Sequence, residues 1–124
     1  MEDSPPEFII FRKPGPLRGT PYDLALDLVV HVHALLDVTD QTRINIKDQL
    51  DRTTTAIAMQ LAHVLEEVQS TRWSIYRSAH KHASTCATLL DIVDRQGTKS
   101  EHLVAARRTC AQLRDALAPL ALRG

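Results

Sequence analysis

The residues best suited to chemistry in this sequence are basic side chains in its second half. Arginine and lysine make charge-assisted hydrogen bonds to phosphate and carboxylate oxygens, so several on one face predict an anion-binding surface. Residues three, four or seven apart share a face of a helix. We interpret these bases first as an ordinary solvated face, with a subunit interface that pairs them with acids, and then contact with nucleic-acid phosphates, as the alternatives. The candidate nucleic-acid contacts are Arg72, Arg77, Lys81, Arg107, Arg108 and Arg114.

The other reactive side chains do not form a catalytic or metal-binding pattern. Two histidine pairs, His31 with His33 and His80 with His82, are spaced by two residues, which turns their rings roughly 200° apart on a helix. Helical bundles that bind metal use Glu-x-x-His motifs, and this sequence has none. It also lacks a nucleophile elbow, a phosphate-binding loop and zinc-spaced cysteines. We therefore expect a protein that is not an enzyme, with no catalytic residues, no metal and no cofactor.

The composition predicts one helical domain. The 124 residues are 44 % hydrophobic but only 4 % aromatic, so the core must consist mainly of Leu, Val, Ile and Ala, which suit close helix packing. Glycines are few, and no strand-like alternation follows Thr20. Cys86 and Cys110 lie on expected apolar faces and are interpreted as buried free thiols, with a disulfide or a metal pair as the alternative.

Amphipathic periodicity predicts four helices, at about residues 21–37, 41–69, 71–96 and 99–118. Short turns between them predict an all-α fold, an antiparallel up-down four-helix bundle over residues 20–124. Neither Gly nor Pro marks the boundary between the second and third helices. Pro119 is expected to end or kink the fourth helix. The expected N-caps, in chain order, are Thr20, Thr39 or Asp40, Ser70 or Thr71, and Thr98.

Residues 1–19 are expected to form an extended N-terminal arm. Its apolar run lies between prolines, which exclude it from a long helix. We interpret the run as packing on its own bundle or on a neighbouring subunit, with a docking peptide for another protein as the alternative. Together with two aromatic residues of the third helix, it supplies the candidate interface residues: Phe8, Ile9, Ile10, Phe11, Trp73 and Tyr76.

The formal net charge is zero, but the charges are unevenly distributed. Residues 1–69 carry eleven acids and six bases, whereas residues 70–124 carry nine bases and four acids. Neutrality disfavours strong non-specific nucleic-acid binding, and the opposed halves favour a basic face or self-complementary contacts between subunits. No stretch is long and apolar enough to span a membrane, and the acidic, proline-rich start is unlike a signal peptide. We therefore expect a cytoplasmic protein without a membrane partner.

Three segments resemble a known family, the four-helix-bundle proteins encoded in intervening sequences of 23S rRNA genes. Residues 22–33 resemble the first helix of that family. Residues 48–52, Asp-Gln-Leu-Asp-Arg, resemble its second-helix pattern D-Q-L-x-R. Residues 76–79 and 86–91 lie where the family has Y-x-I-A and a Cys- and Leu-rich stretch. The sequence departs at residues 60–64, which read Gln-Leu-Ala-His-Val where the family reads N-I-A-E-G.

The resemblance implies a non-enzymatic bundle that often forms a homopentameric ring. Relatives include the accessory variability determinant of diversity-generating retroelements, which binds a reverse transcriptase and nucleic acid. Our leading hypothesis is a self-assembling accessory scaffold. The alternatives are an RNA- or DNA-binding accessory factor for a reverse transcriptase or ribosomal RNA, and an adaptor that binds a protein partner through the arm. Because His63-Val64 replaces the family's Glu-Gly, the second helix is expected to continue to about Gln69.

Overall fold

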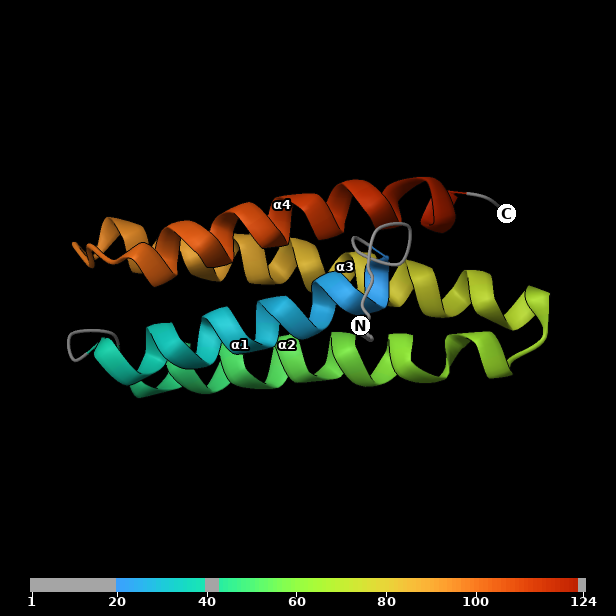
Figure 1. Ribbon diagram of the computed structural model, residues 1–124, viewed down its shortest axis with the longest axis horizontal. Helices are drawn as coiled ribbons and strands as arrows, with labels where there is room; N and C mark the ends of the chain where they lie inside the picture. The colour runs from blue at the N-terminus through green and yellow to red at the C-terminus, as the bar shows by residue number, and fades with distance from the viewer. Residues whose placement is uncertain (1–19, 40–42, 123–124) are drawn as a thin grey trace, which may run out of the picture.

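The computed structural model describes residues 20–39 and 43–122, and their long helices form a bundle (Figure 1). α1 spans Pro21–Val38, α2 Ile44–His63, α3 Gln69–Arg95 and α4 Glu101–Leu122, and a short 3₁₀ helix, η2, spans Val64–Glu66. Each long helix packs on the next in the chain, and α4 packs on α1. The described residues therefore confirm the all-α, antiparallel up-down four-helix bundle. The expected arm, residues 1–19, lies outside the described residues.

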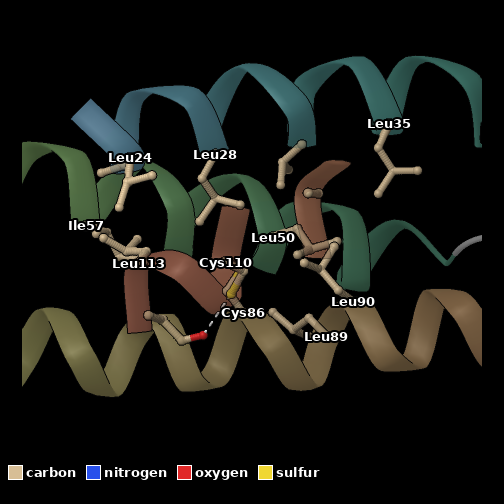
Figure 2. Packing of buried hydrophobic residues seen from close by; sticks show 14 of the residues in the cluster. Leu24, Leu28, Leu35, Leu50, Ile57, Cys86, Leu89, Leu90, Cys110 and Leu113 are labelled. Atoms are coloured by element: carbon tan, nitrogen blue, oxygen red, sulfur yellow. Dashed lines mark hydrogen bonds between the residues drawn. The ribbon is translucent and has the colours of Figure 1, made fainter. Parts of the chain in front are cut away.

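One apolar stripe from each helix builds the core, because stripes spaced by three and four residues place their side chains on one face. Leu28, Leu50, Leu90 and Leu113, one from each long helix, are all fully buried. Figure 2 shows these leucines in the space between the helices. The core also contains the hydroxyl of Thr54, which donates to the carbonyl oxygen of Leu50 at 2.9 Å and so is buried with a partner.

The first turn of the bundle differs from the expected one. Thr20 caps α1 as predicted, its Oγ1 accepting from the backbone N–H of Asp23 at 3.1 Å. Thr39 does not cap α2, because its buried hydroxyl donates to the carbonyl oxygen of Leu35 at 2.6 Å and so closes the end of α1. α2 begins after Arg43, which makes no side-chain capping bond. Asp40, the other predicted cap, lies outside the described residues.

The prediction that the second helix continues to about Gln69 is wrong. α2 ends at His63, η2 ends at Glu66, and Val68 rather than Ser70 or Thr71 is the N-cap of α3. The guanidinium group of Arg72 stabilises this turn by donating to the carbonyl oxygens of Glu67 at 2.8 Å and Leu65 at 3.0 Å. The apolar pattern does continue through the turn. However, Figure 1 shows that the turn projects beyond the ends of α1 and α4, and two of its apolar residues, Leu65 and Val68, are 72 % and 68 % exposed.

Both ends of α4 also differ from the predicted ends of the fourth helix. Ser100 rather than Thr98 caps the helix, since its Oγ accepts from the backbone N–H of His102 at 3.0 Å. Pro119 lies inside α4 and does not end it. The helix continues to Leu122, and the indole Nε1–H of Trp73 donates to the carbonyl oxygen of Ala121 at 2.9 Å. This bond holds the last turn of α4 against α3.

The capping assignment predicts different effects for two matched substitutions. Ser100→Ala is expected to lower the free energy of unfolding by about 1 kcal/mol, because the N–H of His102 loses its acceptor. Thr98→Ala deletes a hydroxyl two residues earlier and is expected to change it by less than about 0.5 kcal/mol. Urea denaturation measures both values. A larger effect from Thr98→Ala would show that Thr98 is the cap.

Candidate functional site

The structure gives the six candidate phosphate contacts different roles. Arg72 is engaged by the carbonyl oxygens of the turn between α2 and α3. The guanidinium carbon of Arg77 lies 4.7 Å from the ring centroid of Trp73, a cation–π contact within α3. Both arginines therefore have intramolecular partners that a phosphate would have to displace or share.

Arg107 connects α4 to α3 through two carboxylates. Its Nη2 lies 2.9 Å from Oδ1 of Asp91, and its Nη1 lies 3.2 Å from Oδ2 of Asp94. Two negative charges thus surround one positive charge, so this part of the α3–α4 surface is not a basic patch. These carboxylates come from the neighbouring helix, which explains why the sequence pattern alone did not reveal the pairing.

Three of the six candidate contacts have charges that could bind a phosphate without displacing a carboxylate of the described residues: Lys81, Arg108 and Arg114. All three are exposed, and none forms an ion pair with another described residue. They do not form one continuous row, because Arg108 lies about 100° around α4 from Arg107 on an ideal helix. The structure therefore reduces the predicted basic face to separated cations.

Trp73 and Tyr76, the predicted interface aromatics, are half-buried at the contact of α3 with α4. Tyr76 packs against the core, and both rings line a pocket of 160 Å³ together with Leu120. The main contacts of both rings lie within this chain. Because the rings are only half-buried, part of each one is exposed. Phe8, Ile9, Ile10 and Phe11 lie outside the described residues, and an interface role for all six residues stays a prediction.

Two of the six histidines, His33 and His82, take part in hydrogen bonds between neighbouring helices. Nε2 of His33 on α1 lies 2.8 Å from Oδ1 of Asp51 on α2. Between α2 and α3, Nδ1 of His82 lies 3.2 Å from Oε1 of Gln60, whose Nε2 donates to Oγ of Ser78 at 2.8 Å. Across residues 20–39 and 43–122, no group of three His, Cys, Asp or Glu side chains is placed to hold a metal ion.

A feature that the sequence reasoning missed is an apolar strip on the outside of α1 and α2. Tyr22, Leu26 and Val30 are 42 %, 41 % and 64 % exposed, and Met59 of α2 is 63 % exposed. Spacings of four residues place the three α1 side chains on one face. In an antiparallel pair the residue numbers of opposite positions have a constant sum, so the His33–Asp51 bond places Leu26 level with Ala58, the residue before Met59. We call these four residues the apolar strip.

The signal for the apolar strip is present in the sequence. Residues 22–36 are apolar at more positions than one buried stripe requires, and the buried face of α1 uses Leu24, Ala25, Leu28, Val32 and Leu35. Of the remaining apolar residues, Val29 and Leu36 are half-buried, and Tyr22, Leu26 and Val30 are exposed. Its spacing alone would predict Tyr22 in the core stripe, but the structure exposes it. Contiguous exposed apolar residues mark interaction sites more often than isolated ones do.

Charge divides between the two sides of the bundle. The described residues before Gln69 carry seven acids and three bases, and those from Gln69 onward carry eight bases and four acids. α1 alone has three aspartates and no lysine or arginine. Because α1 packs on α2 and α3 packs on α4, the two halves of the sequence become opposite sides of the bundle (Figure 1). We call them the acidic side and the basic side.

Comparison with protein-family models, curated proteins and solved structures finds no match for this chain. Within the part of the chain that the structure describes, no helix has the length and apolar character needed to cross a membrane. Two surfaces are the candidate interaction sites: the apolar strip on the acidic side and the exposed cations on the basic side.

Proposed function

We propose that this protein is a non-catalytic scaffold that self-assembles, with the acidic side of one copy against the basic side of the next. The division of charge between the two sides carries the proposal, because each side complements the other in sign. The apolar strip lies on the acidic side and supplies area to bury. A contact between two different surfaces of identical subunits is called heterologous. Repeating this contact closes a ring when the rotation from one subunit to the next divides a full turn evenly. The resemblance of residues 22–95 to ring-forming bundles supports a homopentamer.

Multi-angle light scattering at micromolar concentration tests this proposal. The expected result is a mass several times the 13.9 kDa of one chain. Because exposed charges face each other in the proposed contact, the assembly is expected to weaken as NaCl rises from about 0.1 M to about 1 M. A monomer at low salt would overturn the proposal, and an oligomer insensitive to salt would remove its electrostatic part.

A second candidate function, binding of RNA or DNA as an accessory factor for a reverse transcriptase or ribosomal RNA, rests on the unpaired cations of the basic side. Arg108→Glu with Arg114→Glu is expected to weaken binding of a labelled single-stranded RNA by at least about 10-fold and to lower the salt slope by about 2. Fluorescence anisotropy measures both. Arg43→Glu with Arg52→Glu, on the acidic side, is the matched control. Undetectable binding of the unmodified chain at low salt would exclude this function.

A further inference from the structure

The contact between α3 and α4 contains both cysteines of the chain. Cys86 on α3 and Cys110 on α4 are buried, and Figure 2 shows them close together in the core. The Sγ–H of Cys110 donates to the backbone carbonyl oxygen of Ala83 at 3.3 Å. Since that carbonyl belongs to the opposite helix, α3 and α4 approach closely at this level.

A pocket connects one of the two thiols with the surface. It has a volume of 180 Å³ and lies between α3 and α4. Its lining consists of Ala87, Leu90, Asp91, Arg107, Cys110, Ala111 and Arg114. Because a water molecule occupies about 30 Å³ in the liquid, several molecules of that size fit. Cys86 does not line the pocket. A small polar molecule entering the pocket therefore meets Cys110 first.

The surroundings also give the two thiols different acidities. The interaction with Cys86 and the positive charge of Arg114 lower the pKa of Cys110, while burial and the negative charge of Asp91 oppose this shift. The interaction with Cys110, together with burial, raises the pKa of Cys86. The thiolate is the reactive form of cysteine. Because Cys110 also lines the pocket and Cys86 does not, Cys110 is the thiol placed to react first.

We propose that Cys110 and Cys86 form a peroxide-reactive dithiol site, in which Cys110 attacks and Cys86 resolves. The Cys110 thiolate attacks one oxygen of hydrogen peroxide, so that an S–O bond forms and the O–O bond breaks. The hydroxide released takes up a proton and becomes water, which leaves Cys110 as a sulfenic acid. The Cys86 sulfur then attacks the Cys110 sulfur, the S–S bond forms, and hydroxide leaves with the Cys86 proton as a second water. Two thiols are oxidised by two electrons while one peroxide is reduced to two waters.

The product would connect α3 to α4 covalently and close a loop from residue 86 to residue 110. Intact-mass spectrometry of the folded chain after exposure to hydrogen peroxide tests the proposal. The expected result is a loss of about 2 Da, reversed by dithiothreitol. Two free thiols remaining in the folded chain, with oxidation only in the urea-unfolded chain, would overturn it.

Single variants distinguish the two roles. Cys86→Ser is expected to stop at a sulfenic acid on Cys110, which dimedone traps, whereas Cys110→Ser is expected to form no dimedone adduct. Arg114→Gln removes the charge beside Cys110 and is expected to slow the oxidation severalfold. Arg108→Gln, an exposed arginine outside the pocket, is the control and is expected to leave the rate unchanged. A dimedone adduct on Cys86, or equal rates in the two arginine variants, would contradict the assignment.

Discussion

Leu113→Ala is expected to lower the free energy of unfolding by about 3–5 kcal/mol. Leu113 is 0 % exposed, and it lies in the middle of α4 within the hydrophobic core (Figure 2). Removing its side chain loses the transfer free energy of the deleted carbons and leaves a cavity that helices held on several sides cannot fill. Because a domain is stable by only about 5–15 kcal/mol, this one substitution removes a large share of the total.

Urea denaturation followed by circular dichroism measures the effect of Leu113→Ala. All variants are compared at the same protein concentration, because self-assembly would make the apparent stability depend on it. The matched control is Leu122→Ala, the same substitution on the same helix at a residue that is 84 % exposed, with an expected change of less than about 0.5 kcal/mol. Equal effects at the two positions would contradict the arrangement of the core described above.

Leu26→Glu combined with Val30→Glu is expected to convert the proposed assembly into monomers of 13.9 kDa. Both substitutions place carboxylates in the apolar strip, which the proposed contact covers. The contact would then have to bury two carboxylates in place of apolar area. The cost of removing these charges from water exceeds what exposed cations of the basic side return, so the contact would be lost. Both residues are exposed, at 41 % and 64 %, and glutamate is a good helix former. The single chain is therefore expected to stay folded, which circular dichroism checks.

The control for this variant is Leu65→Glu combined with Val68→Glu. These residues are 72 % and 68 % exposed and lie at the turn between α2 and α3, away from the apolar strip. The control adds the same charge through the same types of substitution, and light scattering is expected to show an unchanged mass. If the unmodified chain assembles and Leu26→Glu with Val30→Glu still assembles, the contact lies elsewhere on the bundle.

The helices were predictable because each one carries its own core stripe within a short stretch of sequence. The buried face of α4 is predicted without reference to any other helix by Leu103, Ala106, Cys110, Leu113, Leu117 and Leu120. The first five are buried, and Leu120 is half-buried. Helix ends were less predictable, because several nearby residues have suitable side chains. Thr98 and Ser100 both have a hydroxyl, but only the Ser100 hydroxyl accepts from the helix N-terminus.

The candidate site was less predictable than the fold, because the partners of its charges come from other helices. Arg107 and Arg108 are adjacent in the sequence and appear equivalent there. In the structure Asp91 and Asp94 of α3 pair with Arg107 alone. Arg72 was likewise a candidate phosphate contact, but its guanidinium group is engaged by the turn before its own helix. The identity of a charged residue therefore did not establish whether its charge is available.

The sequence by itself determined four helical segments, a core of aliphatic side chains and an excess of acids before an excess of bases, since these are properties of composition and short-range spacing. Only the tertiary structure decided what lies at the surface. Because α1 packs on α2 and α3 packs on α4, the half of the sequence with more acids and the half with more bases lie on opposite sides of the bundle. The same packing directs one apolar face of α1 into the core and leaves Tyr22, Leu26 and Val30 exposed. A helix has room to bury only one face, and its neighbours determine which face that is.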